Sequence, residues 1–300
     1  MPPLPAYRPA VIPRSLALAA LALAACARPS AIDLHPSRIT VSVSGESRPF
    51  KRVVSLVPSV TEDLFAVGAG ATVLGVSEYT DYPPRAQRLP VVATFASIAT
   101  ERIVALHPDV AIGITAQDRL AGDLRRAGVN VVLLHDDSFA DIFANLVELG
   151  AMTGHERDAK ALVARLHART AALVRTVKRR GSKPAVFVVL GTAPVFTVGA
   201  GSYIANLIEM AGGRNAAGDI RAAYARYSAE ALVARQPDLL IVDPTVRLND
   251  VLGQAPWNAL RAVQRHRVYT LPDAAILERP GPRYNEGLSW LIATLDQAGR

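Results

Sequence analysis

Cysteine is almost absent from this chain of 300 residues, since Cys26 is its only one. A single cysteine excludes a disulfide framework and leaves no thiol downstream for a metal site or a nucleophile. Aromatic residues make up only 6% of the sequence, and no run of lysine and arginine is longer than the three residues 178–180. The formal charge of +7 is therefore spread over single positions, which argues against nucleic-acid binding.

Recognised catalytic motifs are also missing. The sequence has no Gly-x-Ser-x-Gly motif, no Gly-x-x-x-x-Gly-Lys phosphate loop and no His-Glu-x-x-His zinc motif, and its six histidines never occur three or four residues apart. His135, Asp136 and Asp137 form one plausible ligand group, but an aspartate pair after a strand is more typical of a loop and a helix cap. We expect no catalytic residue, no metal site and no enzymatic activity; a hydrolase or metal-handling enzyme that uses these three residues is the alternative.

The only long apolar run lies near the N-terminus. Residues 16–25 are all leucine or alanine, Arg8 and Arg14 precede them, and Cys26 follows. This run is too short to span a membrane and is typical of a secretory signal. Residues 23–26 (LAAC) resemble the lipobox of bacterial lipoproteins. We therefore expect a signal peptide at 1–25, lipid attachment at Cys26, a tether at 26–51 and an exported, membrane-anchored protein; an ordinary secretory signal is the alternative.

A twelve-residue pattern occurs twice. Residues 101–112 and 230–241 are identical at six positions of twelve, and each copy opens with a glutamate, breaks at Pro-Asp and continues as an aliphatic run. This pattern predicts a short helix, a turn and a buried strand in each copy. The separation is too long for a solenoid period, so it indicates two similar α/β lobes that face each other across a cleft.

Strand and helix patterns alternate along the rest of the chain, which predicts a mainly parallel sheet in each lobe. Residues 157–180 combine helical apolar spacing with an absence of proline and glycine, so we expect one long helix and lobes that tilt only modestly. The predicted fold class is α/β, with an N-terminal lobe at 52–154, a connecting helix at 155–181 and a C-terminal lobe at 182–300. Further predicted strands are 52–57, 73–76, 130–134, 185–190 and 267–271, and further predicted helices are 116–127, 138–154, 202–211 and 284–296.

Pro58 ends the first predicted strand of the N-terminal lobe. Ser59 or Thr61 is then expected to cap the following helix, with Glu62 in its first turn. Ser59 also stands at the carboxyl end of a strand, where open α/β sheets bind ligands, and this makes it a candidate pocket residue.

Four segments carry a family resemblance: residues 77–87 (SEYTDYPPRAQ), 101–109 (ERIVALHPD), 194–199 (PVFTVG) and 278–283 (ERPGPR). They resemble the vitamin B12 (cobalamin) binding proteins of bacterial ABC importers, within the wider siderophore, haem and cobalamin binding-protein class. The similarity runs from about Arg52 to the C-terminus. It implies a class III periplasmic binding protein fold and a lipid-anchored component that captures cobalamin or a related corrinoid between its lobes. A haem or ferric-siderophore binding protein is the close alternative.

The resemblance also implies the ligand contacts, at Tyr79, Phe95, Phe196, Tyr224, Glu278 and Arg279. Phe95 and Tyr224 stand where the family has tryptophan. Ile114 replaces a further tryptophan, and Ile276 or Leu277 occupies the aromatic part of the 278–279 loop, so the cleft should be less aromatic but still apolar. Flat aromatic walls suit a broad, partly apolar macrocycle fringed with amides. Ordinary core packing is the alternative for Phe95 and Phe196.

The two repeat glutamates acquire a role from the same resemblance. Glu101 and Glu230 would dock against arginines of the two permease subunits, whereas first-turn acids that favour the helix dipole are the simpler interpretation. The implied partners are a permease dimer with its ATPase subunits, a small corrinoid ligand and the membrane. The protein itself is expected to be a monomer without a resident cofactor. A domain that signals ligand occupancy to a receptor is a further alternative.

Overall fold

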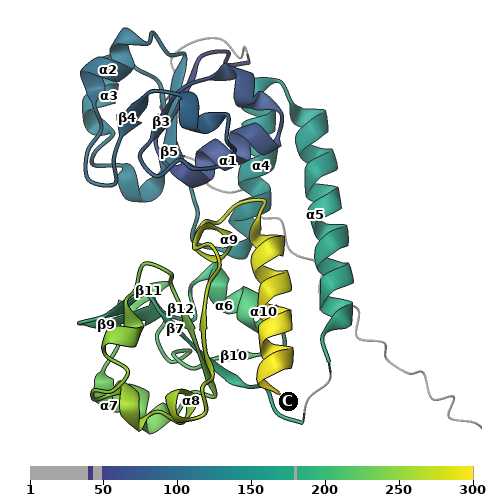
Figure 1. Cartoon of the computed structure of the whole chain (residues 1–300). Coiled ribbons are helices and arrows are strands. Elements are labelled where there is room, and N and C mark those ends of the chain that lie inside the picture. The colour runs from purple at the N-terminus through teal and green to yellow at the C-terminus, as the bar shows by residue number, and fades with distance from the viewer. Residues whose placement is uncertain (1–39, 43–48, 179–180, 300) are drawn as a thin grey trace, which may run out of the picture. The chain divides into compact units, whose positions relative to one another are not determined.

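Figure 1 shows a computed structural model, which describes residues 40–42, 49–178 and 181–299. Cys26, the predicted signal peptide and most of the predicted tether lie outside these ranges. The described chain contains two lobes, each built on a mainly parallel sheet. No helix within the described ranges has the length and apolar character needed to cross a membrane.

The N-terminal lobe contains a six-stranded sheet in the order β1-β6-β5-β2-β3-β4. All neighbouring strands are parallel except β1, which pairs antiparallel with β6. Since β5 and β3 lie on opposite sides of β2, the strand order reverses at β2, where open α/β sheets bind ligands. The strands are β1 Thr40–Ser42, β2 Val53–Ser55, β3 Val73–Ser77, β4 Val91–Ala93, β5 Val110–Ile114 and β6 Val131–Leu134, and the helices are α1 Pro58–Ala66, α2 Thr100–Ala105, α3 Gly122–Arg126 and α4 Phe139–Thr153.

The C-terminal lobe contains a parallel four-stranded sheet in the order β10-β7-β12-β13 and a small antiparallel sheet in the order β11-β9-β8. The strands are β7 Ala185–Val189, β8 Gly191–Thr192, β9 Val195–Val198, β10 Arg214–Asn215, β11 Tyr224–Arg226, β12 Leu239–Val242 and β13 Val268–Thr270. The helices are α6 Tyr203–Met210, α7 Ala229–Arg235, α8 Arg261–Gln264, α9 Ala275–Glu278 and α10 Tyr284–Ala298. The central strands β7 and β12 are fully buried.

The repeat predicted from the sequence is present as α2–β5 and α7–β12, and its turn has the same conformation twice. His107 and Gln236, at equivalent positions, both have a left-handed backbone, with φ of 45° and 44°. Asp109 then accepts the backbone N–H of Lys51 and Arg52, and Asp238 accepts that of Ala185. Each repeat aspartate therefore holds the chain at the start of the central strand of its own sheet.

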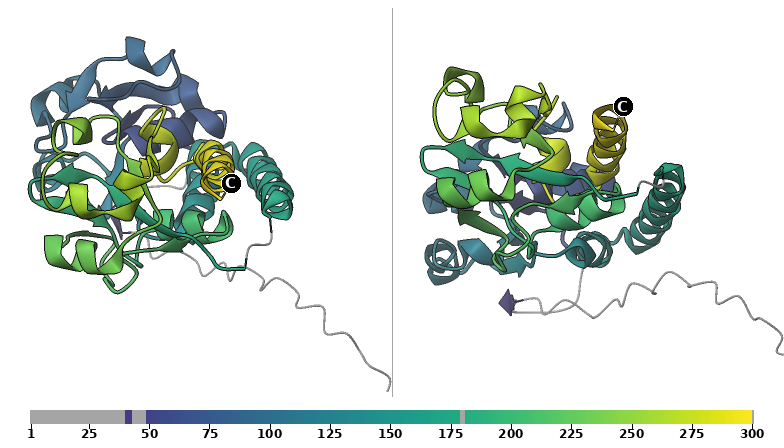
Figure 2. Two further views of the ribbon diagram at one scale, coloured as in Figure 1. Left: turned by 60° about the horizontal axis from the view of Figure 1, so that its bottom comes forward. Right: turned by 90° about the horizontal axis from the view of Figure 1, so that it is seen from below.

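One long helix, α5 (Glu156–Thr176), connects the two lobes, and α10 packs along it (Figure 2). The Thr170 and Tyr284 hydroxyls lie 2.6 Å apart, and Thr170 also donates to the Asn285 amide oxygen at 3.0 Å. The ring of Phe143 in α4 stacks on His167 and meets Tyr284 edge to face. Buried side chains of both lobes thus form one continuous apolar cluster along these helices, which favours small tilts over a wide hinge.

Several local predictions were wrong in part. The helix predicted at 116–127 is interrupted, because the Gln117 side chain folds back to donate to the Leu56 carbonyl at 3.1 Å. Residues Thr115–Gln117 form a 3-10 turn, and only Gly122–Arg126 (α3) form an α-helix. Neither Ser59 nor Thr61 caps α1: Pro58 is already inside the helix, and the Thr61 hydroxyl donates to Ser55 at 2.8 Å. Within the predicted tether, residues 40–42 form the edge strand β1.

Candidate functional site

A pocket of about 400 Å³ opens at the carboxyl ends of three N-terminal strands, opposite α9 of the C-terminal lobe. The N-terminal lining comes from the residues that follow β2, β3 and β4, as expected for a parallel sheet. The lining residues are Leu56, Val57, Pro58, Ser77, Glu78, Tyr79, Thr94, Phe95, Ala274, Ala275, Glu278 and Arg279. Four of the predicted ligand contacts, Tyr79, Phe95, Glu278 and Arg279, therefore lie around one pocket.

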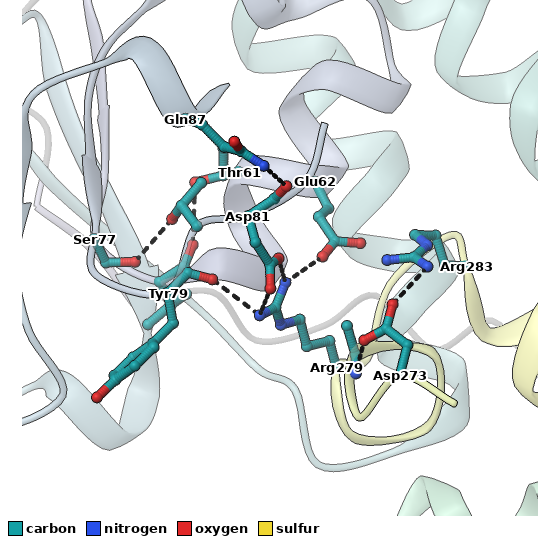
Figure 3. Close-up of polar contacts among 12 residues, drawn as sticks. Thr61, Glu62, Ser77, Tyr79, Asp81, Gln87, Asp273, Arg279 and Arg283 are labelled. Carbon is teal, nitrogen blue, oxygen red and sulfur yellow. Dashed lines mark hydrogen bonds and ion pairs between the residues drawn. The ribbon is translucent and has the colours of Figure 1, made fainter. Parts of the chain in front are cut away.

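Two aromatic side chains of this pocket are unusually exposed. Phe95 is 92% exposed and Tyr79 is 74% exposed, so neither packs in a core and the core-packing interpretation of Phe95 was wrong. The carboxylate of Glu78 accepts the Phe95 backbone N–H at 3.0 Å, which fixes the loop that carries the ring. Tyr79 has a φ of 60°, a left-handed conformation that is uncommon for an aromatic residue. Its carbonyl faces Arg279 while its ring points away (Figure 3).

Arg279 is the centre of an ion-pair network between the lobes. Its guanidinium donates to Glu62 at 2.8 Å, to Asp81 at 2.5 Å and to the Tyr79 carbonyl at 2.9 Å (Figure 3). Burial raises the pKa of Glu62, and the hydrogen bond from Arg279 offsets only part of that rise. Burial also opposes ionisation of Asp81, but the bonds from Arg279 outweigh it and lower its pKa. The positive charge of Arg279 is therefore shared between two carboxylates of the N-terminal lobe.

Arg283 is engaged in a similar way. It donates to Asp273 at 2.9 Å and to Glu286 at 3.2 Å, and its guanidinium lies 4.5 Å from the centre of the Tyr82 ring. A cation over a tyrosine face gains from the ring quadrupole. Both arginines of the 278–283 segment thus hold the loop of residues 79–82 against the C-terminal lobe.

Several ionisable groups at or near the pocket have raised pKa values. Burial, the hydrogen bond to Asp243 and the charge of Asp243 raise the pKa of Glu278 to about 9, so Glu278 is protonated at neutral pH. Burial, followed by the charges of Asp137 and Asp141, raises the pKa of Asp136 to about 6. Desolvation together with the charges of Asp136, Glu278 and Asp137 raises the pKa of Tyr224 to about 12. These shifts place Tyr224 in the electrostatic field of carboxyl groups from both lobes.

The other predicted ligand contacts are not among the residues that line this pocket, and they differ in exposure. Tyr224 is 43% exposed, and Phe196 is half-buried on β9, paired with β11. Ser59 is 9% exposed, directly after the lining residue Pro58. Ile276 and Leu277 are buried, so they add no apolar surface to the cleft.

Sequence patterns missed the acids that neutralise the arginines. Glu62 is 2% exposed on α1, and its pairing with Arg279 spans 217 residues, beyond the reach of any local motif. Its one signal was that Glu62 and Asp63 are the only charged residues of this helix. In the described ranges, no cluster of three or more histidine, cysteine, aspartate and glutamate side chains could hold a metal ion.

The repeat glutamates lie outside this pocket. Glu101 and Glu230 are exposed in the first turns of α2 and α7. The Ser228 hydroxyl donates to Glu230 at 2.6 Å and lowers its pKa. Both carboxylates are thus available to a partner, and docking to a permease stays a prediction.

Comparison with known proteins identifies the architecture. Residues 53–275 match the family model described as periplasmic binding protein. An uncharacterized ABC transporter substrate-binding lipoprotein of Bacillus subtilis is 26% identical over 302 aligned residues, covering 94% of this chain and 95% of the relative.

Two solved structures share the fold. The periplasmic vitamin B12 binding protein of Vibrio cholerae has a TM-score of 0.74 and 27% identity, covering 84% of this chain and 99% of that chain. The periplasmic haem-binding protein of Roseiflexus sp. RS-1 has a TM-score of 0.75 and 29% identity, covering 83% and 99%. The prediction of a class III, two-lobed α/β fold is confirmed. The chain belongs to the periplasmic binding protein family, as an exported ABC transporter substrate-binding protein of the vitamin B12, haem and siderophore class.

Proposed function

We propose that this chain captures cobalamin or a related corrinoid in the pocket between its lobes and delivers it unchanged to an ABC permease. The two solved relatives have nearly equal TM-scores and bear different ligand names, so overall fold does not choose between corrinoid and haem. The choice rests on the chemistry of the cleft.

The observation that carries the proposal is that the two arginines at and beside the pocket are already paired with carboxylates. Arg279 is bonded to Glu62 and Asp81, and Arg283 is bonded to Asp273 and Glu286. Haem carries two propionates and many ferric siderophores are anionic, so either ligand would need cations released from these pairs. A corrin is fringed with neutral amides. Glu278, whose proton bonds to Asp243, adds no negative charge to the pocket, and the corrin can stack on the exposed rings of Tyr79 and Phe95.

One observation favours haem as a second candidate. The Tyr79 ring is 74% exposed at the pocket, and a tyrosine phenolate is a known axial ligand of haem iron. Haem binding through Tyr79 would give a coloured complex with a Soret band that the Tyr79→Phe variant lacks.

Calorimetry with cyanocobalamin, hemin and a ferric siderophore separates these ligands. We expect cyanocobalamin to bind with one site per chain and the other two ligands to bind weakly or not at all. Phe95→Ala should weaken it about tenfold, because half of a phenylalanine surface is worth roughly 1–2 kcal/mol when a ligand covers it. Val174→Ala, at a position 39% exposed on α5, is the control and should bind normally. Tight binding of hemin without any of cyanocobalamin would overturn the proposal.

Anchoring and delivery belong to the same proposal. The lipobox-like residues 23–26 support lipid attachment at Cys26, and the B. subtilis relative is itself named a lipoprotein. Metabolic labelling with a palmitate analogue should mark the native chain, and Cys26→Ser should abolish the label and release the protein from membranes. The exposed carboxylates of Glu101 and Glu230 support docking to permease arginines. Their double alanine variant should spare binding and impair uptake.

A further inference from the structure

The solvent-facing side of the connecting helix α5 is positively charged. Residues 159–178 contain no aspartate or glutamate, and their basic residues are Lys160, Arg165, Arg169, Arg175 and Lys178. The two lysines are paired, with Glu156 and Asp296. The three arginines are exposed and have no ion pair or hydrogen bond within the described part of the chain. Their charges therefore face solvent without a partner.

The fold does not explain this arrangement. Arg175 lies in the last turn of α5, where a cation interacts favourably with the helix dipole. Arg165 and Arg169, however, stand four residues apart, and like charges at i and i+4 destabilise a helix. An acid at one of these positions is the usual choice on an exposed helix. The arginine pair thus costs stability in the free protein, and a negatively charged surface would remove that cost.

Alanine forms the centre of the same face. Exposed alanines at a spacing of three or four residues share one side of α5, and they are Ala161, Ala164, Ala168, Ala171 and Ala172. Protein interfaces are depleted in alanine and rich in large aromatic side chains, so this face does not suit a protein partner. A second copy of the chain would also bring arginine against arginine, which opposes association.

We propose that this face of α5 rests on the anionic phospholipid surface of the membrane that carries the lipid anchor. The helix has 21 residues and is about 32 Å long, and phospholipid headgroups attract basic side chains over such an extended surface. The proposal rests on the proposed lipid attachment at Cys26. The chain from Cys26 to Thr40 spans at most about 50 Å, so the anchor keeps α5 within reach of the same membrane.

This contact orients the pocket. Helix α10 lies between α5 and α9 (Figure 1), and α9 contributes to the pocket lining. With α5 on the membrane, the pocket faces away from the lipid and toward the solution that supplies the ligand. Each arginine beside an anionic surface strengthens such a contact about fivefold, so three arginines give an attachment that is readily reversed.

Fluorescence quenching in vesicles tests the contact. The acylated chain is anchored in vesicles with a fluorophore on Ala168→Cys, or on Ala127→Cys at the exposed end of α3 as the control. A quencher on the lipid headgroups should quench the label at 168 in phosphatidylglycerol vesicles but not in phosphatidylcholine vesicles. Salt at about 1 M, where the screening length is about 3 Å, should reverse the quenching. The label at 127 should stay bright throughout.

Paired substitutions separate charge from side-chain geometry. Arg165→Gln/Arg169→Gln should lower the ratio of membrane-bound to free α5 about 25-fold. Arg165→Lys/Arg169→Lys should keep that ratio, because a lipid surface attracts charge and does not need the guanidinium fork. Arg88→Gln/Arg119→Gln removes two exposed arginines outside this face and should behave like the wild type. Glutamine and lysine are both good helix formers, so α5 should stay folded in each variant.

The outcomes separate this inference from the lipid anchor beneath it. Equal quenching at 168 and 127, or equal quenching in neutral and anionic vesicles, would overturn the contact. Loss of quenching in Arg165→Lys/Arg169→Lys would exclude a lipid surface as the partner. If metabolic labelling finds no lipid at Cys26, the anchor fails. Flotation of the unacylated chain with phosphatidylglycerol vesicles then still tests the face, and Arg165→Gln/Arg169→Gln should abolish it.

Discussion

Replacing Arg279 with methionine should destabilise the protein in a strongly pH-dependent way. The change keeps a long side chain but removes the charge that compensates Glu62, whose side chain is 1% exposed. Removing one partner of a buried ion pair typically costs 3–5 kcal/mol. Glu62 can limit that cost by taking up a proton, so the cost follows the pH.

The size of the stability loss in Arg279→Met follows from the ordinary pKa of Glu62, which is 4.5. Keeping such a carboxyl protonated in the folded state costs about 4 kcal/mol at pH 7.5 and under about 1 kcal/mol at pH 5, at about 1.36 kcal/mol per pH unit. In the variant, Glu62 keeps in the folded state a proton that the unfolded chain has released. The free energy of unfolding therefore falls as the pH rises above 4.5.

Urea denaturation followed by circular dichroism at pH 5 and pH 7.5 measures this difference. The double variant Glu62→Gln/Arg279→Met needs no proton at position 62, so it should be more stable than Arg279→Met at pH 7.5, and its stability relative to the wild type should change little between pH 5 and pH 7.5. Arg283→Met is the control, because its partners Asp273 and Glu286 have side chains 43% and 51% exposed and its loss should cost about 1 kcal/mol or less. An equal loss for Arg279→Met at both pH values would refute the reasoning.

Three further predictions concern single side chains. Between pH 4.5 and about 9 the wild type should lose stability relative to Glu278→Gln in urea titrations, because the raised pKa of Glu278 keeps a proton that the unfolded chain releases. Phe95→Ala should leave the melting temperature within about 1 °C of wild type, since the ring is 92% exposed; a larger drop would mean that it supports the fold. His107→Gly should stabilise the protein by about 1 kcal/mol, because glycine adopts a positive φ freely. Gln236→Gly should not, since it also loses side-chain bonds to Ala259 and Arg261, and equal effects of the two variants would contradict this account.

Sequence patterns predicted helices and strands well where neighbouring residues alone decide where the element begins and ends. The helices predicted at 138–154 and 202–211 begin where a local cap is present: Ser138 and Asp141 form a capping box at α4, Ser202 caps α6, and Gly154 ends α4 in the left-handed conformation. The helix expected at 116–127 fails because Gln117 is held by the Ile114 N–H and the Leu56 carbonyl. A tertiary hydrogen bond between residues 61 positions apart has no local signature.

The residues of the candidate site likewise include some that a sequence motif reveals and some that only the folded chain brings together. Motif resemblance placed Tyr79, Phe95, Glu278 and Arg279 around one pocket. It left out Glu62, because a buried acid is compensated by a partner that only the folded chain brings near. The edge strand β1 does have a local signal, because Ile39, Val41 and Val43 alternate with polar residues, which is the period of two expected for a strand.

The repeated aspartate contacts also bear on how the chain folds. Asp109 bonds to a backbone amide 57 residues earlier, and Asp238 bonds to one 53 residues earlier. Loop closure entropy depends only weakly on length, so the two contacts close their loops at nearly the same entropic cost, within about 0.1 kcal/mol. Neither contact needs the other half of the chain. The central strand of each sheet can therefore be held in place within its own lobe, at a similar cost in loop entropy.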